Sequence, residues 1–145
     1  MTQEDKQLLL ADLCARLPYG VICEYTSIQP GYELYNEIGV LESIQKDYQS
    51  YKFVIDGHSC GFSDFKPYLR PMSSMTEEEC DMVEEILGDK CIFDFMSNGD
   101  IVLKQGQFSQ NKLAKLYDYY ASIHVDYRGL IPKGLALEAP EDMYK

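Results

Sequence analysis

Two arginines stand in short aromatic stretches where a guanidinium could bind a ligand. Arg70 follows Tyr68 in the segment PYLRP, and Arg128 follows Tyr127 in the segment DYRG. The planar guanidinium binds a carboxylate or phosphate through two parallel hydrogen bonds, and it stacks on tyrosine rings. These four residues are therefore candidates for an anion-binding or peptide-binding site. The alternative is that each arginine pairs with a nearby acid or with loop carbonyls and only holds its own segment in place.

A histidine and a cysteine two residues apart form a second candidate for chemistry. His58 and Cys60 lie in the segment HSCG, and a nearby imidazole helps to form the thiolate that nucleophilic catalysis requires. No family-specific protease signature surrounds Cys60, and buried cysteines are commonly inert. Cys60 and His58 are therefore weak catalytic candidates.

The sequence predicts neither a metal site nor a bound cofactor. The two histidines are His58 and His124, and the acidic residues do not follow the spacing of a calcium loop. The glycines form neither a dinucleotide-binding pattern nor a phosphate-binding loop, and no serine lies in a G-x-S-x-G setting. The cysteines are never spaced as C-x-x-C, which disfavours zinc sites and disulfide frameworks. They are Cys14, Cys23, Cys60, Cys80 and Cys91.

The formal net charge of −11 limits the kinds of partner that the protein can bind. There are 24 acidic residues against 13 lysines and arginines, and such a chain repels the phosphate backbone of nucleic acids. The charge fits a protein that stays in solution or one with a basic protein partner. The first residues lack the basic and apolar regions of a secretory signal, and no apolar run approaches the length of a membrane span. We therefore expect a cytoplasmic protein that binds neither nucleic acid nor membrane.

Hydrophobic periodicity and turn signals predict three helices and two groups of strands. Thr2 and Thr76 each precede an acid three residues later, as N-cap residues of helices do. Gly39 is expected to mark a β-bulge, and Asn98-Gly99 is expected to form a hairpin turn. The predicted helices span 2–17, 76–88 and 109–124, and the predicted strands span 21–26, 51–56, 91–95 and 101–104. Segment 32–45 contains two extended runs, 32–35 and 38–44, which are either two strands or one long bent strand.

Two segments fit neither periodicity and are expected to be irregular. Segment 56–75 is too rich in aromatic residues for a linker, so it either packs as scaffolding or exposes an interface patch. The tail from Asp126 carries four large aliphatic side chains, and burying each would contribute about 1.5–3 kcal/mol. We therefore expect the tail to lie across the domain. The order of the elements predicts a single domain, 1–145, with an α+β fold: a mainly antiparallel sheet with about three helices packed on it.

Three segments of the chain resemble a known family. They read LPYG from position 17, SDFKPYLRPMSSMTEEE from position 63 and DYRGLIPKGLALEAPE from position 126. Together they resemble an uncharacterised family of small proteins from gut anaerobic bacteria and their phages or mobile elements. The resemblance implies a phage or mobile-element setting, and it implies no activity, cofactor or residue role.

The sequence favours a small acidic interaction module that binds another protein. The alternative is a small enzyme that uses the segment around Cys60 and His58, or an arginine-lined anion site. Fold analogy does not decide between them, because one fold hosts unrelated functions.

Overall fold

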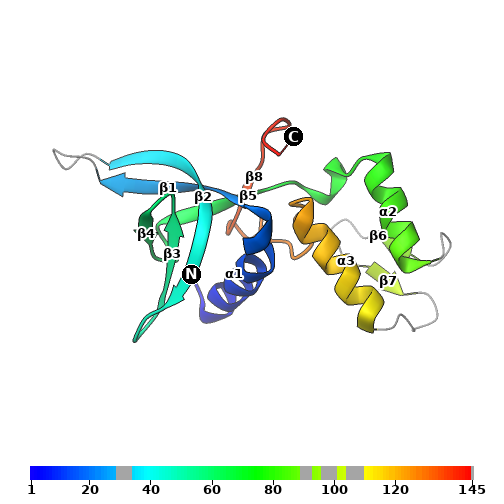
Figure 1. Ribbon diagram of the computed structural model, residues 1–145, viewed down its shortest axis with the longest axis horizontal. Helices are drawn as coiled ribbons and strands as arrows, with labels where there is room; N and C mark the ends of the chain where they lie inside the picture. Colours follow the sequence, from blue (N-terminus) through cyan, green and yellow to red (C-terminus); the bar gives the residue numbers. More distant parts are fainter. Residues whose placement is uncertain (29–33, 89–92, 96–100, 104–109, 145) are drawn as a thin grey trace.

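The computed structural model describes residues 1–28, 34–88, 93–95, 101–103 and 110–144. The molecule is elongated, with a β-sheet towards one end and a pair of helices at the other (Figure 1). The helices and strands, in chain order, are α1 (Gln3–Arg16), the 3-10 helix η1 (Leu17–Tyr19), β1 (Ile22–Ile28), β2 (Leu34–Lys46), β3 (Tyr51–Ile55), β4 (His58–Cys60), β5 (Phe65–Leu69), the 3-10 helix η2 (Met72–Ser74), α2 (Glu77–Leu87), β6 (Phe93–Phe95), β7 (Ile101–Leu103), α3 (Gln110–Ser122) and β8 (Leu137–Glu138).

The main sheet has six strands in the order β4-β3-β2-β1-β5-β8. All neighbouring strands in it are antiparallel except β5 and β8, which run parallel. A separate two-stranded hairpin is formed by β6 and β7. These observations confirm the predicted α+β fold with a mainly antiparallel sheet.

Helix α1 covers the inner face of this sheet, as Figure 1 shows. It begins at a capping box, in which Thr2 and Asp5 each accept a hydrogen bond from the other's backbone N–H. Leu9 and Leu13 lie on one side of the helix and are completely buried against the sheet. The same core contains side chains from β1, β2, β3 and β5. They include Cys23, Tyr25, Leu41, Phe53, Ile55, Phe65 and Leu69.

The expectation that segment 56–75 is irregular was wrong. It contains the strands β4 and β5 and the 3-10 helix η2, and β5 lies inside the sheet between β1 and β8. Proline inside a run normally argues against a strand. Strand β8 pairs only with Tyr68 and Leu69, so Pro67 has a neighbouring strand on one side alone. The predicted irregular tail likewise contains β8.

Helices α2 and α3 pack on each other beyond the edge of the sheet (Figure 1). The prediction had placed them on the sheet itself. The capping box of Thr76 and Glu79 begins α2 as predicted, and Val83 and Leu116 are among the side chains that form a second core between the two helices. The predicted turn at Asn98-Gly99 and the predicted N-cap at Ser109 lie outside the described residues.

The bulge in β2 was expected at Gly39, but it lies a few residues further along the strand. The register with β3 shifts between Leu41 and Ser43, so one extra residue is accommodated there. Gly39 has a different role, because a Cβ atom at this position would lie 2.6 Å from Oδ2 of Asp56. The Asp56 carboxylate also accepts a hydrogen bond from the backbone of Val40. Gly39 therefore leaves room for the turn that follows β3.

A buried ion pair joins the sheet to the helical pair. Asp12 and Arg16, one turn apart on α1, are both completely buried, and Nε of Arg16 donates to Asp12 at 2.7 Å. Nη2 of Arg16 donates to the carbonyl oxygen of Val125, 2.7 Å away, in the segment after α3. Burial raises the pKa of Asp12, and the guanidiniums of Arg16 and Arg128 act in the opposite direction. The pair thus ties α1 to the end of α3.

We expect Asp12→Ala to lower the free energy of unfolding by about 3–5 kcal/mol, because Arg16 would stay buried without its counter-ion. Replacing both charges by apolar groups, in Asp12→Leu/Arg16→Met, should cost less than removing Asp12 alone. Urea denaturation measures both values. Lys52→Ala is the control, since its pair with Asp47 is about half exposed and should contribute less than about 1 kcal/mol. A loss in Asp12→Ala as small as in the control would contradict this role.

Candidate functional site

The guanidinium of Arg70 is fully engaged by groups of the protein itself. It contacts both carboxylate oxygens of Glu79, at 2.8 and 2.7 Å, and it donates to the carbonyl oxygens of Ser74 and Ile123. The bond to Arg70 lowers the pKa of Glu79 and raises that of Arg70. An incoming anion would therefore have to displace Glu79. Arg70 joins the end of β5 to the first turn of α2 and to Ile123, the residue that follows α3.

Arg128 lies beside different partners. Its Nε is 3.1 Å from the hydroxyl of Tyr127 and 3.5 Å from the buried carboxylate of Asp12. The ring of Tyr127 is stacked on those of two α3 tyrosines, Tyr117 and Tyr120. Among the described residues, Arg70 and Arg128 share no side-chain partner.

Tyr68, the fourth residue of the predicted anion site, is half-buried on β5. Its hydroxyl donates to Glu24 at 3.4 Å, and burial together with Glu24 raises its pKa. It does not contact Arg70 or Arg128 through any described hydrogen bond. The anion or peptide site therefore stays a prediction, with Tyr68, Arg70, Tyr127 and Arg128 as its candidate residues.

Cys60 lies in a setting that opposes thiolate formation. Its side chain is buried, and burial followed by the charge of Asp64 raises the pKa of the thiol. The ring of His58 is engaged elsewhere: Nδ1 lies 3.3 Å from the hydroxyl of Tyr25 and 3.2 Å from the carbonyl oxygen of Asp56. Within the described residues the imidazole does not bond to the sulfur, so this geometry provides no base for a nucleophilic cysteine.

His124 is buried where α3 ends and is stacked on the ring of Tyr144, with ring centroids 3.8 Å apart. The hydroxyl of Tyr144 accepts from the backbone of Ile22 and donates to that of Tyr68, so the C-terminal segment is fastened between β1 and β5. Burial, helped by Arg16 and Arg70, lowers the pKa of His124 to about 4. The imidazole is therefore neutral at pH 7.

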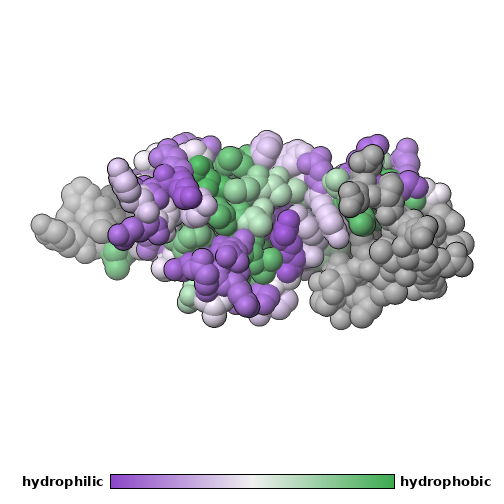
Figure 2. Space-filling view, turned by 90° about the horizontal axis from the view of Figure 1, so that it is seen from below, coloured by the Kyte–Doolittle hydropathy of each residue, from purple (hydrophilic) through white to green (hydrophobic). Residues whose placement is uncertain are grey.

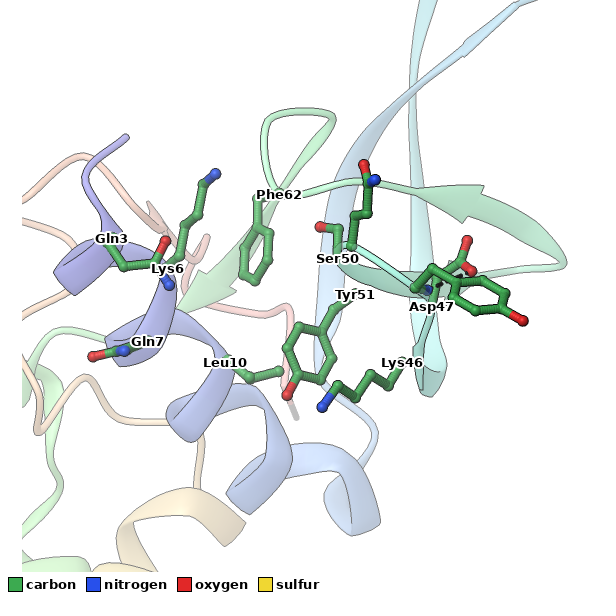
Figure 3. A pocket seen from close by; sticks show the side chains of 11 residues that line it. Gln3, Lys6, Gln7, Leu10, Lys46, Asp47, Ser50, Tyr51 and Phe62 are labelled. Atoms are coloured by element: carbon green, nitrogen blue, oxygen red, sulfur yellow. Dashed lines mark hydrogen bonds between the residues drawn. The ribbon is translucent and has the colours of Figure 1, made fainter.

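A pocket of about 320 Å³ opens between α1 and the turn that joins β2 to β3 (Figure 3). Its α1 wall consists of positions 3, 6, 7 and 10, the spacing that places side chains on one face of a helix. Its apolar floor is formed by Leu10, Tyr51 and Phe62, and the last two rings meet edge to face. The lining residues are Gln3, Lys6, Gln7, Leu10, Lys46, Asp47, Tyr48, Gln49, Ser50, Tyr51 and Phe62.

The charges that line this pocket differ from those of the chain as a whole. Lys6 and Lys46 line it, and the one acidic lining residue, Asp47, is paired with Lys52. The ammonium of Lys6 lies 5.8 Å from the ring centroid of Phe62. No described acid forms an ion pair with Lys6 or Lys46. The lining is thus locally positive in a protein with a net charge of −11. The i, i+3, i+4, i+7 spacing on α1 is present in the sequence, but it does not by itself predict this pocket.

The outer face of the sheet exposes large apolar side chains. Strand β2 extends beyond β3, which pairs with it only from Leu41, and β1 extends beyond β5, which pairs with it only up to Tyr25. We call the projecting part, residues 26–28 and 34–40, the hairpin arm (Figure 1). Three large apolar side chains at even positions of its β2 strand are exposed: Leu34, Ile38 and Val40, with exposed fractions of 69%, 56% and 41%. On an alternating strand they share the face opposite to that of the buried Leu41.

Hydrophobic surface is also visible in the middle of the molecule. On the face shown in Figure 2, hydrophobic side chains gather there between hydrophilic margins. Larger apolar patches on a protein surface commonly mark binding sites.

Comparison with protein-family models, curated proteins and solved structures finds no match to this chain. None of the described helices combines the length and the apolar character needed to cross a membrane. Within the described ranges, no three histidine, cysteine, aspartate or glutamate residues are grouped so that they could hold a metal ion.

We expect Arg70→Ala to lower the free energy of unfolding by about 1–3 kcal/mol, because Glu79 and two backbone carbonyls would lose their donor. Arg70→Lys should lose less, since it keeps the charge but not the two parallel bonds. Thermal or urea unfolding of the purified variants measures this. Unchanged stability in Arg70→Ala would show that the fold does not need these contacts. The guanidinium of the wild-type protein could then bind a ligand instead.

We also expect His124 to make the protein less stable in acid. Its pKa is about 4 in the folded protein, below the ordinary 6.5, so the unfolded chain binds the proton first. Stability then falls as the pH drops from about 6.5 towards 4, by about 2 kcal/mol between pH 7 and pH 5. Urea denaturation at the two pH values should show this loss in the wild type and in the control His58→Gln. An equal loss in His124→Gln would show that His124 does not cause the loss of stability in acid.

Proposed function

We propose that this protein is an interaction module that binds another protein through the outer face of its hairpin arm. The observation that carries the proposal is the row formed by Leu34, Ile38 and Val40, which stays exposed on a strand whose opposite face is buried at Leu41. Single exposed apolar residues are normal. Three on one face of one projecting strand, with the polar Asn36 between Leu34 and Ile38, form a mainly apolar strip suited to a partner.

The backbone of the arm supports the same function. Strand β2 pairs with β1 along one edge and, from Leu41 onward, with β3 along the other. From Leu34 to Gly39 this second edge has no described strand beside it. The backbone N–H and C=O groups on such an edge can pair with an added strand, which gives affinity, while alternating side chains give specificity.

Charge indicates the chemistry of the partner. Glu24 lies opposite Ile38 on β1, and Glu42 follows the strip on β2. Together with the net charge of −11, they favour an apolar patch rimmed by lysine and arginine, because complementary charge speeds encounter and suppresses wrong partners. We place this interaction in the cytoplasm, in the phage or mobile-element setting that the sequence resemblance suggests. No feature of the Cys60 and His58 region favours the alternative of an enzyme.

The experiment compares single variants of two exposed apolar residues. Ile38→Asp places a charge in the middle of the strip, and Met82→Asp places one on α2, where Met82 is 42% exposed. A partner captured from host lysate and then purified should bind Ile38→Asp at least about 10-fold more weakly than wild type. Met82→Asp should bind like wild type. Calorimetric titration measures the affinities.

Thermal unfolding and sedimentation complete this test. Both variants should melt within a few degrees of wild type, since surface substitutions usually change stability by less than about 0.5 kcal/mol. If Ile38→Asp binds every purified partner with wild-type affinity, the arm is not the interface. If the wild type is a dimer that Ile38→Asp dissociates, the partner is a second copy and the proposal of a foreign protein is wrong.

A further inference from the structure

The pocket between α1 and the β2–β3 turn has the size and composition of a small-molecule site. Its volume of about 320 Å³ is at the lower end of the range for such sites. A cavity of about 150 Å³ is enough to hold a benzene molecule. The pocket therefore has room for one aromatic ring and its polar substituents.

The floor of the pocket suits a flat apolar ligand. Leu10 and Tyr51 are half-buried, and Phe62 is 9% exposed. The rings of Tyr51 and Phe62 have centroids 6.3 Å apart and an interplanar angle of 79°. Aromatic rings favour edge-to-face and offset contacts of this kind, so a third ring can add to the pair without distorting it.

The two lysines suit anionic groups at the two ends of such a ligand. Figure 3 shows Lys6, on α1, and Lys46, at the end of β2, on opposite sides of the Phe62 and Tyr51 rings. The contact of Lys6 with Phe62 is a weak cation–π interaction at 5.8 Å, and a carboxylate can replace it. Asp47 does not neutralise either lysine, because it pairs with Lys52.

We propose that this pocket binds a small aromatic dianion, with the ring on the floor of Leu10, Tyr51 and Phe62 and one anionic group at each of Lys6 and Lys46. The site lies at the opposite end of β2 from the strip on the hairpin arm. The proposal does not depend on the protein partner of that arm.

Terephthalate, a benzene ring with carboxylates at both ends, is the probe. We expect saturable shifts of the backbone amide signals of Lys6, Gln7 and Ser50 in ¹H–¹⁵N spectra as terephthalate is added up to about 20 mM. Benzoate, with one carboxylate, should bind about 5- to 10-fold more weakly. The neutral 1,4-benzenedimethanol should give no saturable shift. The titrations are done at about 0.15 M salt, which screens the acidic residues elsewhere on the chain.

Three lysine variants assign the effect to the pocket. Lys6→Gln and Lys46→Gln should each weaken terephthalate binding about 5- to 10-fold, to the level of benzoate. The control is Lys66→Gln, which removes an exposed lysine from β5, outside the pocket. It should leave the affinity unchanged, and the melting temperature of each variant shows whether its fold is intact.

Four outcomes would overturn the proposal. With no saturable shift from terephthalate, the pocket does not bind the class of ligand proposed. With equal binding of the neutral diol, the lysines do not contribute. With benzoate as tight as terephthalate, the two ends do not act together. With Lys66→Gln as damaging as Lys6→Gln, the attraction is a general effect of charge and not of this pocket.

Discussion

The fully buried ion pair of Asp12 and Arg16 is the interaction on which the arrangement of the molecule depends. Each charge loses its hydration, and the loss is tolerated only while carboxylate, guanidinium and the Val125 carbonyl keep their positions. Two of these groups belong to α1, which packs on the sheet, and the third follows α3. The same contact therefore fixes how the sheet core and the α2–α3 core meet.

Arg70 makes a similar contact with a backbone carbonyl in the same segment. Arg16 donates to the carbonyl oxygen of Val125, and Arg70 donates to that of Ile123. The Ile123 carbonyl directly follows the last residue of α3, where helix carbonyls lack partners within the helix and cations stabilise them. Both arginines thus hold the segment that follows α3, and their positive charges add to burial in lowering the pKa of His124. The surfaces available to ligands lie elsewhere, on side chains that the fold does not require for its own contacts.

The sequence predicted the local elements better than their assembly. The capping residues Thr2 and Thr76 were recognisable because a cap depends on neighbours three residues away. Strand β5 was missed because Pro67 hides its alternation, and only its pairing with β1 reveals it as a strand. The aromatic setting of Arg70 was visible, but Glu79 as its partner depends on how β5 meets α2. The pocket was missed because Lys46 reaches it from a strand distant in sequence.

Strand β2 links the two proposed binding surfaces through its bulge. Side chains of a strand alternate between its faces, so Leu34, Ile38 and Lys46, all at even positions, would share the outer face of a regular strand. The extra residue between Leu41 and Ser43 reverses the alternation, and Lys46 pairs with Tyr51, which lines the pocket on the inner face. Before the inserted residue the inward positions of β2 are odd-numbered, and after it they are even-numbered, so β2 carries the strip on its outer face and Lys46 on its inner face. Deleting the inserted residue would restore regular pairing and keep Lys46 opposite Tyr51, so the strip and the pocket lysine would both keep their faces.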